Sequence, residues 1–317
     1  MLPAVSPSDA RAILGALLAV ASVRGRDQVT KADKASIAAV SRYMFRQEAP
    51  LDLDRLAPVT PAALAPALGK PELAAYALQL LAVMALVDGV LDGEKIAAVA
   101  GYAQALGIEE AYLAELTEAA AGHLRWALLD MTRKNIESVF DKPWAEDGDA
   151  MALFLPYQKG ATDPALAARY EGLGELPEGS FGRAFWDFYK QNGYLFPGEE
   201  DALNALFATP HDSTHVVSGY DTTAPGEVLV STFTAAMHRK WPMAGHILPV
   251  IFSWHLGIKI NDVAKSTTGS LDPEKFWRAW SRGAAVDIDL FHSGWDFWSW
   301  TGESLEALRR RHGVTPL

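Results

Sequence analysis

HDSTHVVSGYDTTAPGE, which runs from His211 to Glu227, is the stretch from which the rest of the sequence is best interpreted. If residues 211–218 are helical, His211 and His215 lie one turn apart on one face, so both rings can reach a single cation. Asp212 then points about 100° away from them. It could turn in as a third ligand or hold a ligand ring from behind, as metal-bound histidines usually require. The spacing therefore predicts a metal site.

The second half of this stretch predicts a turn and a further ligand. Gly219 and residues 220–226, with their Pro-Gly pair, should end the first helix, and a new helix should start near Glu227. Two imidazoles with carboxylate oxygens suit Zn²⁺, Fe²⁺ or Mn²⁺ better than Ca²⁺ or Mg²⁺. The alternative is that His211 and Asp212 cap a helix and His215 is an ordinary histidine, because two histidines at i and i+4 also arise by chance.

The pattern H-D-x-x-H, followed by eleven residues and Glu, resembles the signature of the coenzyme Q biosynthesis protein 4 family. Two flanking regions are similar to the same family: LPEGSFGRAFWDFYKQNG at 176–193, and WSRGAAVDIDLFHSGWDFWSW with SLEALRRRHGV near the C-terminus. The resemblance covers roughly residues 165 to 317. It implies Zn²⁺ as the cofactor, with Fe²⁺ or Mn²⁺ as alternatives. The metal-ligating and catalytic residues that it implies are His211, Asp212, His215 and Glu227.

The resemblance also implies a role in ubiquinone biosynthesis, as a metal-dependent carboxy-lyase that removes the ring carboxylate of a polyprenylated hydroxybenzoate. In such a reaction a cation stabilises the charge that develops on the ring as carbon dioxide leaves. If oxygen is also installed, Zn²⁺ cannot carry out the redox step, and an Fe²⁺ site with two histidines and one carboxylate would be better suited.

Two other functions stay open. A non-catalytic scaffold would hold a polyprenyl lipid and organise other quinone-biosynthesis proteins at the membrane, with the metal in a structural role. A metal-dependent hydrolase is disfavoured, because the Asp of HDxxH is one methylene shorter than the Glu of the HExxH motif and Glu227 follows sooner than a third ligand commonly does.

Composition limits the remaining classes. With 317 residues and 50% hydrophobic content, the chain is long enough for two domains with buried cores. A net charge of −11 argues against nucleic acid as a partner, and the absence of cysteine excludes disulfides and thiolate ligands. Residues 12–23 follow an acidic residue and prolines, which favours a buried helix over a signal peptide. No apolar run is long enough to cross a bilayer. We expect a cytoplasmic protein with peripheral contact at the inner face of the membrane, and homo-oligomerisation stays open.

The expected fold class is all-α, with an N-terminal helical bundle at 1–128, a linker at 129–160 and a metal-binding domain with an apolar lipid pocket at 161–317. In the first of these, Ser6 or Ser8 should cap the first helix and Gly107 should end the fourth. Apolar residues recur at helical spacing in five segments, namely 11–23, 33–46, 72–87, 94–106 and 109–128.

The segment MALVDGVLDGEKIAAVAGYAQALGI, at 84–108, resembles the tellurite-resistance B-like domains. Its carboxylates Asp88, Asp92 and Glu94 could bind a divalent cation. The alternative, which we favour, is that Asp88 makes the turn and that Asp92 and Glu94 cap the next helix.

Residues 181–189 carry an aromatic stripe at helical spacing, with Arg183 beside it. Such a stripe is more often core than ligand pocket. The functional alternative is the wall of a substrate pocket, with Arg183 near an acidic head group; its residues would be Phe181, Arg183, Phe185 and Tyr189. His246 and His255 stay unassigned, and His238 is too far along its helix from Glu227 to be a ligand.

Overall fold

The structure is a computed structural model that describes residues 2–140, 156–238, 240–259 and 266–317. Within these ranges the protein is all-α, as predicted: it has fifteen α-helices, and extended pairing is limited to two isolated bridges. The helices of the first half are α1 (Pro7–Ala21), α2 (Lys31–Ala39), α3 (Pro61–Ala67), α4 (Pro71–Met84), α5 (Gly93–Leu106), α6 (Ala111–Ala120) and α7 (Leu124–Phe140).

Local signals place several ends of these helices correctly. The Ser6 hydroxyl accepts the backbone N–H of Asp9 at the start of α1, and Gly107 ends α5 in the left-handed conformation that favours glycine. Two predicted helices differ. The segment 33–46 leaves α-helical geometry after Ala39 and continues as a π-helical turn, and the segment 109–128 is broken at Gly122, where φ is +89°. Residues 129–140 continue α7, and residues 141–155 of the predicted linker lie outside the described residues.

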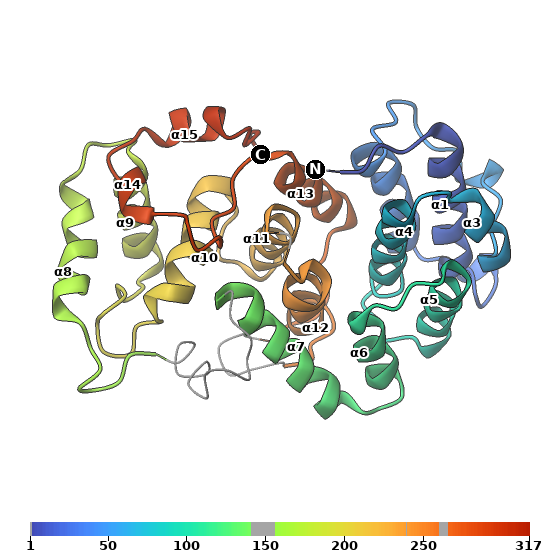
Figure 1. Cartoon of the computed structure of the whole chain (residues 1–317), viewed down its shortest axis with the longest axis horizontal. Coiled ribbons are helices and arrows are strands. Elements are labelled where there is room, and N and C mark those ends of the chain that lie inside the picture. Colours follow the sequence, from blue (N-terminus) through green and yellow to red (C-terminus); the bar gives the residue numbers. More distant parts are fainter. Residues whose placement is uncertain (1, 141–155, 239, 260–265) are drawn as a thin grey trace.

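The second half contains α8 (Pro164–Glu171), α9 (Phe181–Asn192), α10 (Ala205–Ser218), α11 (Ala224–Met237), α12 (Leu248–Trp254), α13 (Pro273–Ala285), α14 (Phe297–Trp300) and α15 (Leu305–Arg311). A π-helical segment, Pro242–Ile247, leads directly into α12. In Figure 1 the helices α11, α12 and α13 lie between the N-terminal helices at one end and α8, α9 and α14 at the other.

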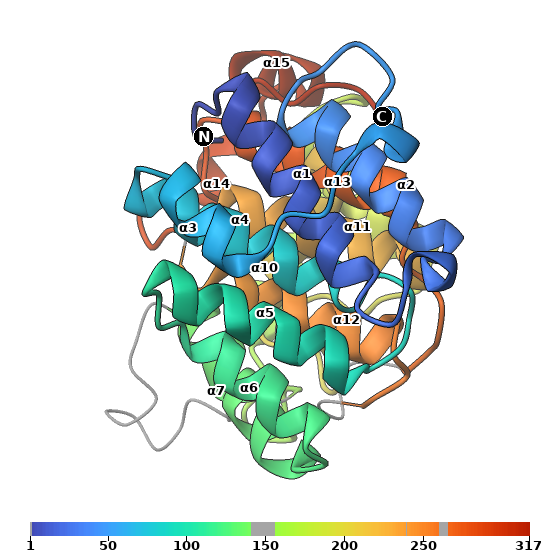
Figure 2. The ribbon, with the colours of Figure 1, turned by 90° about the vertical axis from the view of Figure 1, so that its right-hand side faces the viewer.

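One hydrophobic core joins the N-terminal helices to this central layer. Its buried side chains come from α1 to α7 and also from α11, α12, α13 and the π-helical segment. On α13, Trp277 is fully buried and its indole N–H donates to the Ser36 hydroxyl of α2 at 2.8 Å. Figure 2 shows α1 and α2 lying over α11 and α13 in the perpendicular view. The two halves of the sequence therefore share buried surface, and the two-domain division stays a prediction.

A second core lies around α9 and is mostly aromatic. Phe297 packs edge-to-face against Phe181 and Phe185, with ring centroids 5.5 and 4.9 Å apart, and Tyr170 lies 5.8 Å from Phe185. Edge-to-face contacts of this kind add to the free energy gained by burying the rings. This core holds α9 against the C-terminal helices and so determines where α9 meets α10.

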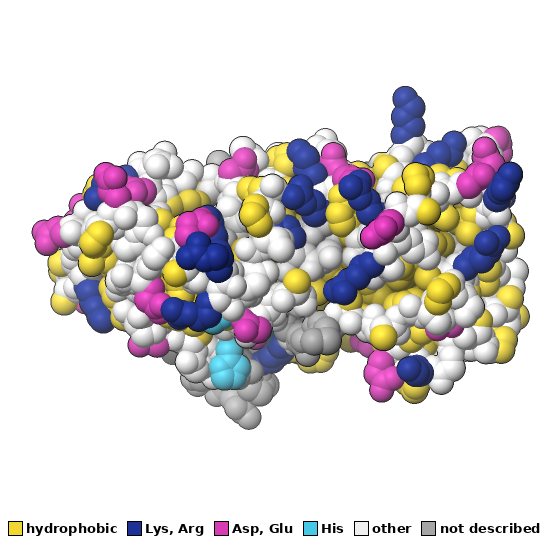
Figure 3. Space-filling view, turned by 90° about the horizontal axis from the view of Figure 1, so that it is seen from above, with side chains coloured by type: hydrophobic (Ala, Val, Ile, Leu, Met, Phe, Trp, Pro, Cys, Tyr) yellow, Lys and Arg dark blue, Asp and Glu magenta, His cyan; other side chains and the backbone are white. Residues whose placement is uncertain are grey.

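The surface carries charges of both signs. In Figure 3, Lys and Arg side chains are interspersed with Asp and Glu, and hydrophobic side chains show between them over the N-terminal helices. Among the described residues, no helix has the length and apolar character needed to cross a membrane.

Candidate metal site

The two histidines lie on α10, as the spacing predicts. The Asn204 side chain accepts the N–H of Leu206 at the start of this helix, and Gly219 ends it with φ at +82°. His211 and His215 are therefore interior residues of α10, one turn apart, with ring centroids separated by 4.9 Å. The alternative in which His211 and Asp212 cap a helix is wrong, because the helix begins two turns earlier.

Glu227 comes from the first turn of α11. The Thr223 hydroxyl accepts the N–H of Gly226. Pro225 occupies the first turn, where a backbone N–H would have no partner within the helix, so the lack of one in proline costs nothing. The helix thus begins at Ala224, slightly before the predicted start. The carboxylate of Glu227 lies near the positive end of the helix dipole and faces α10.

The three side chains converge. Nε2 of His211 lies 3.6 Å from one carboxylate oxygen of Glu227, and Nε2 of His215 lies 3.6 Å from the other. One donor atom from each residue lies within 4.8 Å of the donor atoms of the other two. Within the described ranges, no other three side chains of the types that bind metals converge in this way. Two ligands of a tetrahedral Zn²⁺ lie roughly 3.4 Å apart, given bonds of about 2.0–2.1 Å. The separations from Glu227 to the imidazoles match that value closely.

The hydrogen bonds of His215 select the tautomer that binds metals. Its Nδ1 lies 3.0 Å from the carbonyl oxygen of Tyr220, which can only accept, so Nδ1 carries the proton. Nε2 is then a lone-pair donor, and it is buried without a hydrogen-bond partner among the described residues. A buried imidazole nitrogen held in this way by a backbone carbonyl is the usual arrangement behind a metal-bound histidine. The residues present therefore fit a divalent cation.

The charges of the three side chains are strongly coupled. Burial would raise the pKa of Glu227, but the two imidazoles outweigh burial and hold that pKa well below its ordinary value. Burial would lower the pKa of His211, but Glu227 and Asp212 outweigh it and raise that pKa. In the metal-free protein, an ionised Glu227 thus favours a proton on His211. A cation would replace that proton.

Asp212 lies beside the group formed by His211, His215 and Glu227 and is not part of it. Its Oδ2 accepts the phenolic hydrogen of Tyr189 at 2.5 Å, and both residues are almost completely buried. Burial raises the pKa of Asp212, and the Tyr189 hydrogen bond and the neighbouring histidines partly offset the rise. Asp212 therefore joins α10 to α9 directly behind the histidine pair.

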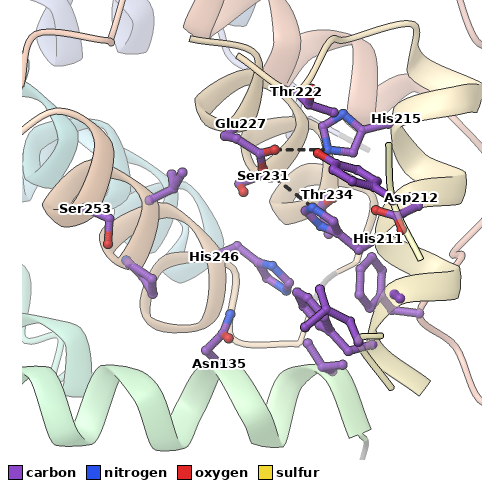
Figure 4. Close-up of a pocket in the computed structure, with 18 of the residues that line it drawn as sticks. Asn135, His211, Asp212, His215, Thr222, Glu227, Ser231, Thr234, His246 and Ser253 are labelled. Carbon is purple, nitrogen blue, oxygen red and sulfur yellow. Dashed lines mark ion pairs between the residues drawn. The ribbon is translucent and has the colours of Figure 1, made fainter. Parts of the chain in front are cut away.

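A cavity of about 460 Å³ opens in front of the three ligands. It lies between α7, α10, α11 and α12, and Figure 4 shows His211, His215 and Glu227 on one side of it, with His246 and Asn135 across from them. Much of the remaining wall is apolar, including Val139, Leu195, Leu203, Phe207, Val250, Trp254 and Phe291. The cavity thus combines three metal-ligating groups with a largely hydrophobic interior.

Aromatic rings support the histidines from the outside. Phe207 stacks on His211 with ring centroids 5.2 Å apart, and Phe188 stacks on His215 at 5.4 Å. Packing on these faces limits rotation of the imidazoles and keeps their nitrogens directed toward Glu227.

Of the predicted substrate-binding residues, Tyr189 lines the cavity, whereas the other three lie away from it. Phe181 and Phe185 are fully buried in the aromatic core. Arg183 pairs with Asp187 at 3.0 Å and donates to the carbonyl of Gly174 at 3.1 Å. The structure thus places Phe181 and Phe185 in the core and pairs Arg183 with an acidic neighbour away from the cavity.

His246, left unassigned on sequence, is a cavity residue. Its Nε2 lies 2.8 Å from the Ser138 hydroxyl of α7, and burial, followed by the charge of His238, lowers the pKa of His246 to about 3. His238 itself pairs with Asp289 at 2.8 Å and lies outside the group formed by His211, His215 and Glu227. The sequence around His246 has no spacing that indicates a site. The residues that form the cavity around it include those of α7 and α11, which lie in other parts of the sequence.

The three N-terminal carboxylates considered as a cation site are paired with basic side chains instead. Asp88 lies 2.6 Å from the Lys95 ammonium, which is buried and also contacts Asp33 at 2.9 Å. Asp92 caps α5 and pairs with Arg24 at 3.0 Å, and Glu94 lies 3.5 Å from the same arginine. The capping interpretation is confirmed for Asp92, and Lys95 supplies the positive charge at Asp88.

Comparison with known proteins adds a weak similarity to a solved structure. No protein-family model and no curated protein matches this chain. A solved structure described as a "Putative ubiquinone biosynthesis protein" from Nostoc punctiforme PCC 73102 is similar over 64% of this chain and 95% of its own, with 18% identity and a TM-score of 0.33. At that TM-score, neither the fold nor the function of this chain is argued from the similarity.

Proposed function

We propose that this protein is a metal-dependent enzyme of ubiquinone biosynthesis that removes the carboxylate of a polyprenylated hydroxybenzoate. One observation carries the proposal: two imidazoles and a carboxylate meet at the wall of a largely apolar cavity, and the lone pair of His215 has no partner there. The ubiquinone assignment comes from the sequence pattern around His211 and Glu227.

The charges of the site favour an acidic ligand. Two neutral imidazoles and one carboxylate leave a divalent cation with a net charge of about +1 in a poorly solvated cavity, where opposite charges attract more strongly than in water. Three protein ligands also leave a coordination position free, which is typical of catalytic rather than structural zinc sites. This favours the enzyme over a scaffold with a structural metal.

Each residue has a defined part in this proposal. His211, His215 and Glu227 hold the cation, the Tyr220 carbonyl fixes the tautomer of His215, and Asp212 with Tyr189 holds α10 in place. The cation, when bound, would polarise a carboxylate or phenolic oxygen and stabilise negative charge on the ring. The apolar wall would exclude water and accept the hydrophobic tail.

Elemental analysis of the purified protein tests the metal. The wild type, the double variant His211→Ala/His215→Ala and the control His123→Ala should be measured together; His123 is exposed in the loop between α6 and α7. We expect one divalent ion per chain in the wild type and the control, and none in the double variant. Equal metal content in all three would refute the site.

Release of carbon dioxide from a carboxyl-labelled prenyl hydroxybenzoate tests the reaction. We expect release by the wild type and the control and none by the double variant. Metal and bound prenyl lipid without any release would support the scaffold function instead.

A further inference from the structure

We infer that the cavity contains a second polar subsite, formed by His246, Thr234 and Ser231. It binds a hydroxyl group of the same ligand whose acid group lies at the metal. This inference rests on the proposed function for the position of the acid group. It adds the residues that recognise the hydroxyl group of that ligand, which line the same cavity as the metal-ligating side chains.

The hydrogen bonds of Ser138 determine the tautomer of His246. The Ser138 hydroxyl lies 2.8 Å from the carbonyl oxygen of Lys240 and 2.8 Å from Nε2 of His246. A carbonyl can only accept, so the single hydroxyl hydrogen goes to Lys240 and Nε2 of His246 must donate to Ser138. If the ring is neutral, its Nδ1 is therefore an acceptor, and no described residue donates to it.

Burial and the neighbouring His238 keep that ring neutral. Both nitrogens of His238 face groups that only accept, since Nδ1 lies 2.8 Å from the Asp289 carboxylate and Nε2 lies 3.0 Å from the Ser138 carbonyl. The rings of His238 and His246 are 5.7 Å apart. Burial, followed by the charge of His238, lowers the pKa of His246 to about 3.

Two side chains of α11 complete the subsite. Ser231 and Thr234 lie one and two turns beyond Glu227, and both line the cavity. Thr234 donates its hydrogen to the Val230 carbonyl at 2.9 Å, so toward the cavity it can only accept. In Figure 4, Ser231 lies next to Glu227.

The subsite is therefore suited to a group that donates a hydrogen bond. Nδ1 of His246 and the Thr234 oxygen both accept, and the Ser231 hydroxyl can do either. A second anion would face two acceptors at this end, whereas a phenolic or alcoholic hydroxyl would satisfy them. A single cavity of about 460 Å³ contains both this subsite and the metal ligands, so one aromatic molecule with an acid and a hydroxyl group can reach both.

Two substitutions at one position separate the subsite from the packing around it. In His246→Gln the amide nitrogen can take the place of Nε2, which keeps the bond to Ser138 and removes the cavity acceptor. In His246→Asn the amide oxygen can take the place of Nδ1, which keeps the cavity acceptor and removes the bond to Ser138. If His246 were only structural, the asparagine variant would be the more damaged of the two.

Calorimetric titration of the Zn²⁺-loaded protein with benzoate, 3-hydroxybenzoate and 4-hydroxybenzoate tests the inference. We expect the better hydroxybenzoate to bind the wild type about tenfold more tightly than benzoate, the effect of roughly one hydrogen bond. His246→Gln should bind all three within about twofold, and His246→Asn should keep part of the preference.

The outcomes distinguish this inference from the proposed function. If the wild type binds all three benzoates equally and only with metal, the subsite is refuted and the metal site stands. If His246→Gln keeps the full preference, the assignment to His246 is refuted. If the hydroxyl preference survives in the metal-free double variant His211→Ala/His215→Ala, the subsite is supported and binding of the acid at the metal is refuted. If no benzoate binds, both are refuted.

Discussion

Replacement of Tyr189 by Phe tests how α9 supports the metal site. Among the described residues, only the Tyr189 hydroxyl donates a hydrogen bond to the Asp212 side chain, at 2.5 Å. Both groups are buried. A hydrogen bond to a charged group contributes about 1.5–3 kcal/mol, and its loss leaves a buried carboxylate oxygen unpaired. We expect Tyr189→Phe to lower the free energy of unfolding by about 2–3 kcal/mol at pH 8.

The matched control is Tyr170→Phe. Tyr170 is equally buried, and its hydroxyl shares a hydrogen bond of 2.6 Å with the neutral Thr209 hydroxyl. A bond between neutral groups contributes about 1 kcal/mol, so this variant should lose less, and by the same amount at every pH.

The pH dependence of Tyr189→Phe has a defined sign. The pKa of Asp212 is already raised above 3.8, and loss of the Tyr189 hydrogen bond raises it further, so the folded variant binds a proton more readily than the wild type. The loss of stability should be small while Asp212 is protonated in both proteins and should grow as the pH rises through the raised pKa of Asp212. Urea unfolding at pH 5 and pH 8 measures this. Equal losses for both tyrosine variants, or a loss independent of pH, would refute the reasoning.

Three further predictions concern Zn²⁺ binding and the ion pairs of the N-terminal helices. Because the pKa of His211 is raised above 6.5 and a metal must displace its proton, Zn²⁺ affinity should fall by up to about tenfold per pH unit as the pH falls through that pKa; a chelator competition that is flat from pH 8 to 6 would contradict this. Glu227→Gln should weaken Zn²⁺ binding by at least about 100-fold, whereas Glu306→Gln, on the exposed face of α15, should leave it unchanged. Lys95→Met should lower the free energy of unfolding by about 3–5 kcal/mol, because it removes the partner of the buried Asp33 and of the partly buried Asp88. Arg24→Met should lower it by less than about 1 kcal/mol, because the Arg24 side chain that pairs with Asp92 is 56% exposed.

The N-terminal helices support the cavity through α12. His255, directly after α12, donates from Nε2 to the carbonyl of Val87 at 3.1 Å and accepts the N–H of Leu271 at 3.2 Å. Trp254, the preceding residue, lines the cavity. One wall of the cavity therefore rests on the end of α4 and the turn that follows it.

The sequence by itself determined the features that depend on neighbours within one or two turns. The spacing of His211 and His215 places both imidazoles on one face of any helix, and Gly219 ends that helix because glycine adopts positive φ without strain. The cap at Ser6 and the stop at Gly107 follow from the same local chemistry. Such features need no knowledge of how the helices pack.

Only the tertiary structure decided which side chains share the cavity. Phe181, Phe185 and Tyr189 belong to one stripe on α9, yet only Tyr189 reaches the cavity. His246 has no local signal and meets α7 and the cavity through packing alone. Helical periodicity specifies which residues share a face, but it does not specify the angle and distance at which two faces meet. Those depend on how side chains far apart in the sequence fit together, and that fit brought Glu227 to the histidines and His246 opposite them.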